Sequence, residues 1–529
     1  MTLERIAQLA RLAGGFRKFL RTPIGIEAAA VEIKRRLEDR ETNFVTLAKQ
    51  LIYDVPSSPY RRLLVWAGCE YCDLRARVAS HGLESTLEKL RDEGVYLSLD
   101  EFKGRASVVR NGLRFETEET DFDNPRLSDG RLIGETSGSR GKRSRVSYDW
   151  DFIAEEARHE TLLYAIHGVL DAPFALWYPV PPGNAGLNNL LKSLKAGLTP
   201  QKWYSQSPCG IFDISLEARL ALEFVIWGSR SAGLTVARPT FASLSDHEDV
   251  ARWMESTIKR SGRAVLRAFG SSALRMTQTA RAIGADLRGG FVFVGGEPLT
   301  EPRRRAFEAA GLEVYPRYVS TESGIISAAC PNRSVADDMH FFSDHLAMVQ
   351  LDRGAASQSE HPKTFLFTAL SLKTGKILFN TELGDFGEVT TKSCSCRFGE
   401  IGLNVHLSNV RSYEKLTIEG MTILTAELDA IIGAAMERAG GRPDSYQFRE
   451  VQDPSGLHRL EIAVSPEVLH LDEAKFIEEI VAELRRGGPR KAMAADFWGK
   501  AASFSVVREE PKPTAGYKMP AVNRSQRSA

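Results

Sequence analysis

The sequence is poor in cysteine and carries no excess of charge of either sign. Its 529 residues include 6 cysteines, too few for a disulfide scaffold in a chain of this length. Lys and Arg number 69 against 68 Asp and Glu, so the net charge of +1 gives no reason to expect nucleic acid or an anionic membrane as a partner. No apolar run approaches the roughly 20 residues that span a bilayer. We therefore expect a soluble protein of the reducing cytoplasm.

The length and the hydrophobic patterning predict an α/β fold with more than one domain. A chain of 529 residues is long enough for two or three domains with sizeable cores. Helical patterns alternate with short apolar strands over 148–325, which is typical of parallel α/β arrangements. After residue 340 the pattern changes to strands with hairpin-like turns, and beyond residue 411 to helices with a strand pair. We predict a large N-terminal domain over residues 1–411, made of α/β subdomains and a small β-rich subdomain, and a small mobile α+β C-terminal domain over residues 412–529.

The stretch TSGSRGK at residues 136–142 has the composition of a phosphate-binding loop. Glycine allows the tight turns that point backbone N–H groups inward, while the hydroxyl groups and basic side chains add donors and positive charge. The Walker-type loop requires two glycines with four residues between them, then Lys followed by Ser or Thr. Gly134 and Gly141 have six residues between them and Arg143 occupies the hydroxyl position, so this is not a Walker-type loop. Taken alone, such a stretch is also typical of an exposed surface loop.

Five further segments follow this stretch along the chain. They are GGEPLTEPRRRAFEAAG (295–311), YVSTESG (318–324), TELGDFG (381–387), RSYEKLTIEG (411–420) and KPTAGYK (512–518). Together with TSGSRGK they resemble the motifs of the adenylate-forming enzymes, which are acyl-CoA synthetases, adenylation domains of peptide synthetases and luciferases. The SCSC at 393–396 resembles the phenylacetate-CoA ligase branch, as do SSPYRRLLVWAG and VYLSLDEFKGR in the N-terminal part. The resemblance covers nearly the whole chain.

The resemblance implies which residues bind ATP. The β- and γ-phosphates would be held by Thr136, Ser137, Gly138, Ser139 and Lys142. The rest of the nucleotide would be contacted by Gly296, Glu297 and Pro298 beside the adenine, Tyr318 stacked on it, Asp385 on the ribose hydroxyls and Arg411 near the ribose and phosphate.

The resemblance also implies which residues take part in the chemistry. Thr321 would contact the α-phosphate, and Glu322 would bind Mg²⁺, a hard cation that prefers carboxylate oxygens. Lys518 would reach the substrate carboxylate and the α-phosphate. Activation of a carboxylate by ATP builds charge on phosphoryl oxygens, so the protein needs cations and hydrogen-bond donors rather than a nucleophile of its own. Without the resemblance, Glu322 is a surface carboxylate, Asp385 a turn residue and Lys518 a solvated terminal lysine.

Three positions depart from the family pattern. Arg140 replaces the usual Ser or Thr, and Arg143 replaces the usual Pro. Tyr413 stands where the family generally has an Asp at which the C-terminal domain pivots. A hinge needs only backbone freedom, so we still expect the domain to rotate. The departure leaves the acyl acceptor open between CoA and another nucleophile.

A second set of residues has the composition of a metal site. Cys394 and Cys396 form a C-x-C, and Cys330 and His340 precede them in the region predicted to be β-rich. Three thiolates and one imidazole make a closed four-coordinate zinc environment, and some relatives of phenylacetate-CoA ligase resemble this sequence here. The alternatives are four separate residues, or a site in which His345 replaces His340.

The function implied by the resemblance is that of an ATP- and Mg²⁺-dependent carboxylic acid ligase. It would form an acyl-adenylate, release pyrophosphate and transfer the acyl group to CoA, with an aryl or arylacetic acid as substrate. Two alternatives stay open: transfer to an amine or a carrier-protein thiol in a secondary-metabolite pathway, and a catalytically silent nucleotide-binding homologue. The stretch YPVPPGNAG (178–186) is a candidate for part of the acid pocket or a plain connection. A homodimer is neither indicated nor excluded.

Overall fold

A computed structural model describes most of the chain. The described residues are 14–127, 132–136, 144–180, 184–210, 214, 216–242, 247–352, 363–412, 415–442, 445–453 and 456–511. Within these ranges, no helix combines the length and the apolar character that a membrane span needs.

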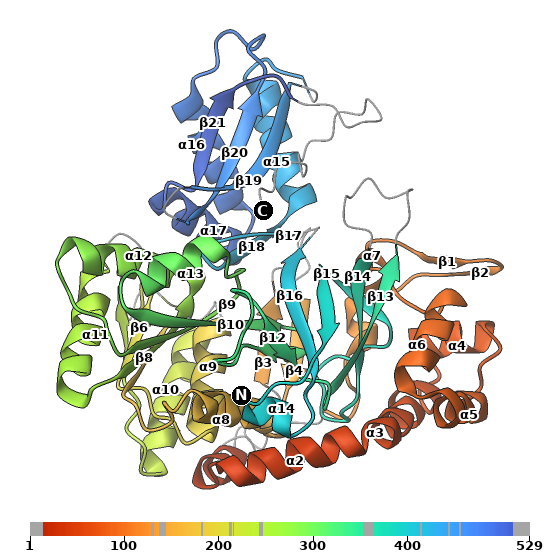
Figure 1. The fold of residues 1–529 in the computed structure, drawn as a ribbon. Helices are drawn as coiled ribbons and strands as arrows, with labels where there is room; N and C mark the ends of the chain where they lie inside the picture. The colour runs from red at the N-terminus through yellow and green to blue at the C-terminus, as the bar shows by residue number, and fades with distance from the viewer. Residues whose placement is uncertain are drawn as a thin grey trace.

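The N-terminal part is helical and lies along one edge of the molecule (Figure 1). Its helices are α2 (Ile26–Glu38), α3 (Arg40–Leu47), α4 (Pro59–Trp66), α5 (Tyr71–His81), α6 (Leu83–Asp92) and α7 (Leu99–Phe102), with a π-helical turn at Ala48–Tyr53. Two short strands, β1 (Val108–Arg110) and β2 (Leu113–Phe115), form a hairpin. Helices α3 to α6 share an apolar core with the antiparallel strands described next, so this part is fixed to the sheet.

One twelve-stranded sheet runs through the body of the protein. Its parallel half consists of β5 (Phe174–Trp177), β6 (Lys202–Ser205), β7 (Pro239–Phe241), β8 (Ala264–Phe269), β9 (Gly290–Gly295) and β10 (Leu312–Ser320). Its antiparallel half consists of β11 (Gly324–Ala328), β12 (Met339–Phe341), β13 (Leu346–Asp352), β14 (Lys363–Ala369), β15 (Thr381–Thr391) and β16 (Val405–Ser412). The α/β fold class is confirmed, and the β-rich region extends the parallel sheet through the β10–β11 pairing.

Helices cover both faces of the parallel half. They are α8 (Trp150–Ile166), α9 (Asn184–Lys195), α10 (Leu216–Ser231), α11 (Glu248–Ser261), α12 (Gly270–Ala282) and α13 (Glu301–Glu308). Side chains alternate between the faces along each strand. Phe174 and Leu176 therefore join the core under α8 and α9, while Ala175 and Trp177 join the core under α11 and α12. A short helix, α14 (Arg397–Glu400), follows β15.

The C-terminal part forms a lobe above the body in Figure 1. It contains β17 (Lys415–Ile418), β18 (Met421–Leu424), α15 (Thr425–Arg438), β19 (Tyr446–Gln452), β20 (His458–Val464), α16 (Glu473–Arg486), α17 (Pro489–Lys500) and β21 (Phe504–Arg508). Its core lies wholly between Leu416 and Phe504. Polar contacts join it to the body: Arg275 pairs with Glu419 at 2.7 Å, and Arg303 donates to the Gly456 carbonyl at 2.7 Å.

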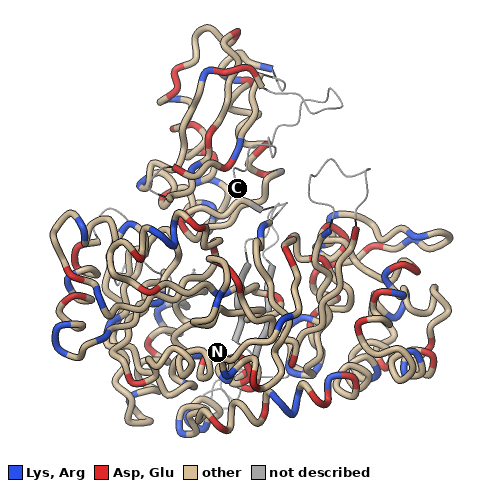
Figure 2. Tube along the Cα trace, in the orientation of Figure 1, with Lys and Arg blue, Asp and Glu red and all other residues tan. Residues whose placement is uncertain are grey.

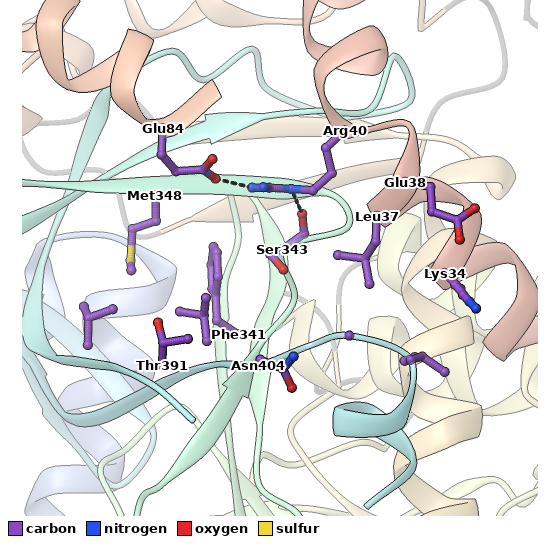
Figure 3. A pocket seen from close by; sticks show the side chains of 14 residues that line it. Lys34, Leu37, Glu38, Arg40, Glu84, Phe341, Ser343, Met348, Thr391 and Asn404 are labelled. Atoms are coloured by element: carbon purple, nitrogen blue, oxygen red, sulfur yellow. Dashed lines mark hydrogen bonds and ion pairs between the residues drawn. The ribbon is translucent and has the colours of Figure 1, made fainter. Parts of the chain in front are cut away.

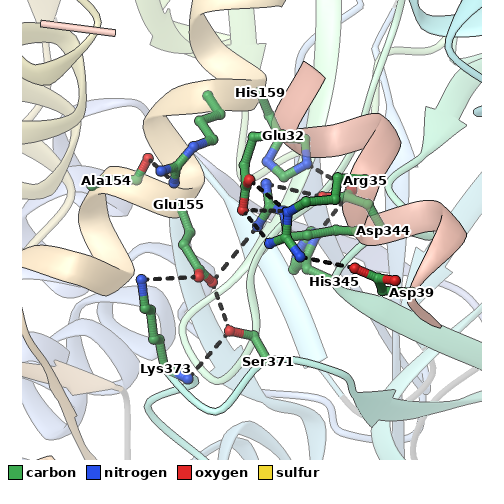
Figure 4. Close-up of polar contacts among 12 residues, drawn as sticks. Glu32, Arg35, Asp39, Ala154, Glu155, His159, Asp344, His345, Ser371 and Lys373 are labelled. Atoms are coloured by element: carbon green, nitrogen blue, oxygen red, sulfur yellow. Dashed lines mark hydrogen bonds and ion pairs between the residues drawn. The ribbon is translucent and has the colours of Figure 1, made fainter. Parts of the chain in front are cut away.

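A buried ionic cluster ties α2 to the body (Figure 4). Arg36 Nη2 lies 3.1 Å from Asp344 Oδ2, and the other oxygen of Asp344 lies 2.8 Å from His159 Nε2 on α8. The His159 ring stacks on Phe342 with centroids 4.2 Å apart. Burial lowers the pKa of His159 to about 4, although Asp344 opposes that shift. The imidazole is therefore neutral at neutral pH.

Charged residues of both signs are mixed along the whole described trace (Figure 2). Many form short-range pairs on helix surfaces, such as Arg304 with Glu308 and Lys259 with Glu255. Pairs of this kind contribute little to stability. The charges that bear on function are therefore the buried ones.

Candidate functional site

The site is built at the carboxyl ends of the parallel strands. Gly295 ends β9 and pairs with Arg317 of β10, so Gly296 and Tyr318 lie at the same edge of the parallel half, where β10 continues to Ser320. Gly296 has φ = +81°, a conformation that favours glycine and lets the chain turn away from the sheet at once. Carboxyl ends of parallel strands are where α/β proteins generally bind ligands.

A cavity of about 510 Å³ opens at this edge, between the body and the C-terminal lobe. Eight of the residues predicted from the sequence line it: Gly296, Glu297, Pro298, Tyr318, Thr321, Glu322, Asp385 and Arg411. The wall also contains Lys103 from the N-terminal part, and Gly488 and Lys491 from the C-terminal lobe. Three parts of the chain that are distant in sequence therefore meet around one space.

Tyr318 and Asp385 are joined directly. The Tyr318 hydroxyl donates to Asp385 Oδ2 at 2.6 Å. Burial and the neighbouring carboxylate raise the pKa of Tyr318 well above its usual value, so the phenol stays protonated and remains the donor. The bond orients the Asp385 carboxylate at the cavity wall.

Arg411 lies on the strand next to Asp385. In the β15–β16 ladder Asp385 pairs with Ser412 and Phe386 pairs with Arg411. Arg411 Nη1 forms an ion pair with Asp337 Oδ2 at 3.1 Å, and both residues line the cavity. The arginine thus brings positive charge to the same wall.

Glu322 stands in the turn between β10 and β11 and is 6% exposed. Lys103 Nζ lies 2.8 Å from Glu322 Oε1 and 2.8 Å from Glu119 Oε1. Burial lowers the pKa of Lys103, but the two carboxylates outweigh it, so the net shift is upward and the amine is charged. The sequence does not single out Lys103, although it lies in VYLSLDEFKGR, a segment that resembles the phenylacetate-CoA ligase branch. No spacing relates it to Glu322, since the contact is made only in the fold.

The Glu297 side chain forms a hydrogen bond and an ion pair with residues of the body. Its Oε1 accepts from Ser271 Oγ at 2.6 Å, and its Oε2 lies 2.8 Å from Arg303 Nη1. The backbone N–H of Gly420 in the C-terminal lobe also donates to Glu297. Glu297 therefore joins the lobe to the body at the cavity edge.

Part of the predicted phosphate loop lies outside the described residues. β3 (Leu132–Thr136) pairs with β4 (Ser144–Tyr148), and Thr136 is opposite Ser144. The predicted loop therefore connects the two strands of a hairpin. Predicted residues outside the described ranges are Ser137, Gly138, Ser139, Lys142 and Lys518, together with Tyr413 at the expected hinge.

The four predicted metal ligands come together on the β-rich side. The ligand atoms of Cys330, His340, Cys394 and Cys396 all lie within 4.8 Å of one another. The Cys330 and Cys394 sulfurs are 3.7 Å apart, against about 3.8 Å for two thiolates on one tetrahedral zinc. His340 Nε2 lies 3.2 Å from Cys396 Sγ, while its Nδ1 is 2.7 Å from the Leu403 carbonyl, which fixes the ring.

Two further observations bear on this cluster. A hydrogen bond from Cys330 lowers the pKa of Cys396, and His340 adds to the shift, which favours the thiolate form of this sulfur. His345, the alternative ligand, instead contacts Asp344 at 3.5 Å in the cluster of Figure 4. The alternative in which His345 replaces His340 as a ligand is wrong, because strand β12 carries His340 to the thiols.

A second cavity, of about 610 Å³, lies on another face (Figure 3). Lys34, Leu37 and Arg40 from the N-terminal helices form one wall, and Phe341 and Thr391 belong to the strands opposite. Arg40 donates to the Ser343 carbonyl at 2.6 Å. None of the predicted ligand-binding residues that the structure describes lines this cavity.

Comparison with known proteins gives a fold but no close relative. No protein-family profile matches the sequence, and no curated protein matches it. A solved 2-hydroxyisobutyryl-CoA ligase in complex with 2-HIB-AMP and CoA is 16% identical, with a TM-score of 0.52 over 93% of this chain and 90% of that chain. An amide bond synthetase variant from Marinactinospora thermotolerans is 12% identical, with a TM-score of 0.42 over 96% and 98%. The first similarity shows that this chain has the fold of that CoA ligase.

Proposed function

We propose that this chain, which has the fold of an adenylate-forming enzyme, is an ATP-dependent carboxylic acid ligase. It joins an acid to AMP, releases pyrophosphate and transfers the acyl group to CoA. One observation carries the proposal: Tyr318 and Glu322 from one segment and Asp385 from another line a single cavity at the carboxyl ends of the parallel strands. A cavity with a few converging polar groups is the usual form of a small-molecule site.

The cavity wall supports a specific placement of the nucleotide. The adenine stacks on Tyr318, and Asp385 accepts hydrogen bonds from the ribose hydroxyls, a charge-assisted contact. The Tyr318 hydroxyl holds that carboxylate from the other side at 2.6 Å. Thr321 then faces the α-phosphate, and the loop at 136–142 covers the β- and γ-phosphates.

In the first step, a carboxylate oxygen of the acid attacks the α-phosphorus. The bond from that phosphorus to the bridging oxygen breaks, and pyrophosphate leaves with the electron pair. Lys518 and Arg411 stabilise the charge on the reacting oxygens, and Thr321 donates to the phosphoryl oxygen. A magnesium ion held by Glu322 would supply further positive charge to the phosphates.

In the second step, the acyl group passes to the acceptor. The CoA sulfur bonds to the acyl carbon, AMP leaves with the electron pair, and the thiol proton goes to solvent. The C-terminal domain, residues 412–529, rotates between the two steps. Its separate core and its polar contacts with the body support this motion.

The cysteine cluster supports a structural zinc site at the end of β15 and β16 away from the nucleotide cavity. Cys330, Cys394, Cys396 and His340 supply four ligands and leave no open coordination position for chemistry. His340 lies on β12, and Cys396 lies in the segment between β15 and β16. The ion would therefore join β12 to the segment that leads into β16, the strand that carries Arg411 to the cavity.

Acid-dependent exchange of labelled pyrophosphate into ATP, measured over a library of carboxylic acids, tests the first step. We expect exchange with wild-type protein and none with Lys518→Ala, while ATP affinity stays nearly unchanged. Lys512→Ala, in the same C-terminal segment, is the matched control and should exchange normally. Exchange at the wild-type rate in Lys518→Ala would refute the role of this lysine. No exchange with any acid would refute the enzyme and leave a nucleotide-binding homologue.

Mass spectrometry of the products then identifies the acceptor. Incubation with ATP, the active acid and CoA should yield an acyl-CoA thioester. An amide formed from a panel of amines, without a thioester, would instead assign the chain to the amide-forming alternative.

A further inference from the structure

A group of charged side chains is buried behind the β10–β11 turn and is not used by the proposed mechanism. It comes from four elements that pack together in the body (Figure 1). Its members are Glu156 and Glu160 of α8, Lys192 of α9, Arg267 of β8 and Arg317 of β10. All five are at most 4% exposed.

Glu160 is the centre of the group. Its Oε1 lies 2.5 Å from Arg267 Nη2 and 2.9 Å from Arg317 Nη1, so one carboxylate serves two guanidinium groups. Arg267 also donates to Asn189 Oδ1 at 2.5 Å and to Ser193 Oγ at 3.2 Å. Burial raises the pKa of Glu160, but the two arginines outweigh it and the net shift is downward, so the carboxyl is ionised.

Lys192 is less well paired. Among the described residues, the carboxylate within ion-pair distance of its Nζ is Glu156, at 3.4 Å. The other oxygen of Glu156 accepts from the Ile325 backbone N–H at 2.6 Å, so this carboxylate is shared. Burial lowers the pKa of Lys192, and although Glu156 and Glu160 oppose that shift, Arg267 and Arg317 add to it. The lysine lacks a carboxylate of its own.

With Lys192 protonated, the described residues joined by these ion pairs are three cations and two anions, an excess of one positive charge. A buried charge without a counter-ion is costly, so an unbalanced group of this kind is suited to an anion that arrives with a ligand.

The group adjoins the nucleotide cavity. Arg317 lines that cavity and donates to the Tyr178 hydroxyl at 3.2 Å. Tyr178 follows β5 at the strand edge where the candidate acid-pocket stretch begins. Glu156 lies against Gly324, where a Cβ would come within 2.0 Å of its Oε1, so the group reaches the turn that carries Thr321 and Glu322.

We propose that this group binds a second anionic substituent of the acid, so that the preferred substrates are dicarboxylic acids. The inference rests on the proposed ligase function and names its substrate class. One carboxylate is activated at the α-phosphate, and the other pairs with Lys192 and Arg317. A monocarboxylic acid of the same size leaves the buried positive charge without a counter-ion and binds more weakly.

The test compares matched acids in the pyrophosphate exchange assay, within a library that contains both classes. Glutarate is paired with valerate, and terephthalate with 4-methylbenzoate. We expect kcat/KM for the diacid to exceed that for its partner by about tenfold or more, the usual size of a charge-assisted contact. In Lys192→Met this preference should fall by a similar factor.

Lys195→Met is the matched control. Lys195 is also a buried lysine of α9, but its Nζ donates to the Phe19 carbonyl at 2.9 Å and the Thr22 carbonyl at 2.6 Å, away from the group. It should keep the wild-type preference. Exchange with monoacids alone, or equal losses for both acids in Lys192→Met, would overturn the inference while the ligase function stands. Absence of exchange with every acid would refute both the dicarboxylate inference and the proposed ligase function.

Discussion

Lys103 Nζ lies 2.8 Å from Glu322 Oε1, so a lysine from the N-terminal part neutralises the carboxylate that the sequence assigns to magnesium. The same amine lies 2.8 Å from Glu119. Lys103 and Glu322 line the cavity, and Glu119 contacts this lysine, so the charge of an arriving nucleotide and its metal ion would be added to this ionic group.

Replacing Lys103 should weaken the use of ATP. In Lys103→Met, Glu322 and Glu119 face each other without a cation, and the phosphate side of the cavity loses a positive charge. We expect kcat/KM for ATP to fall by about ten- to a hundredfold, the range for loss of a charge-assisted contact. Steady-state kinetics at saturating acid measure this. Lys373→Met, at a partly exposed surface lysine, is the control, and an unchanged kcat/KM in Lys103→Met would show that this lysine has no part in ATP use.

Asp385 should matter for nucleotide binding more than for fold. Asp385→Asn keeps the shape but removes the charged acceptor, so the affinity for ATP should drop by about tenfold or more. Glu388→Gln is the matched control, because Glu388 lies on the same strand but is exposed. Calorimetric titration with ATP measures both variants. Equal affinity in Asp385→Asn and wild type would exclude a ribose contact.

The cysteine cluster predicts about one zinc ion per chain. Atomic emission analysis of protein purified without chelator measures the ratio. Cys396→Ser should lose the metal and lower the melting temperature, because three segments lose the ion that joins them. Cys72→Ser, at an exposed free cysteine, should keep the metal. Stable wild-type protein that contains no zinc after this purification would rule out the site.

Acid should destabilise the body through His159. Burial lowers its pKa to about 4 in the folded state, against 6.5 as the ordinary value. The neutral ring thus contributes its full stability above pH 6.5, and this is lost as the pH falls from 6.5 towards 4. Between pH 7.5 and 5 the loss is about 2 kcal/mol for this residue.

Urea unfolding at the two pH values measures the change. His159→Gln, which cannot take up the proton, should show a smaller difference between pH 7.5 and 5 than wild type. An identical difference in the variant and in wild type would show that His159 does not contribute to the acid sensitivity.

The sequence singles out residues that line one cavity because each lies in a short segment with its own pattern. YVSTESG places Tyr318 and Glu322 near the end of β10, and TELGDFG places Asp385 within β15; both segments line the same cavity. The alternation of apolar strands and helices likewise predicts the parallel half of the sheet.

Contacts between distant segments could not be predicted in this way. Lys103 and Glu322 lie 219 positions apart, and no local pattern relates them. The pairing of Lys192 with Glu156 depends on how α9 packs on α8, which is decided by the whole core. The choice of His340 over His345 depends on the register of β12 with β16, where His340 is opposite His406.

The central claim is that adenine nucleotide binds in the cavity between the body and the C-terminal lobe. Photolabelling with 8-azido-ATP, followed by peptide mapping, tests the location most directly. We predict labelled peptides that contain Gly296–Pro298 or Tyr318, with labelling abolished by excess ATP. Saturable labelling confined to the second cavity, near Lys34 and Arg40, or no saturable labelling at all, would contradict the account.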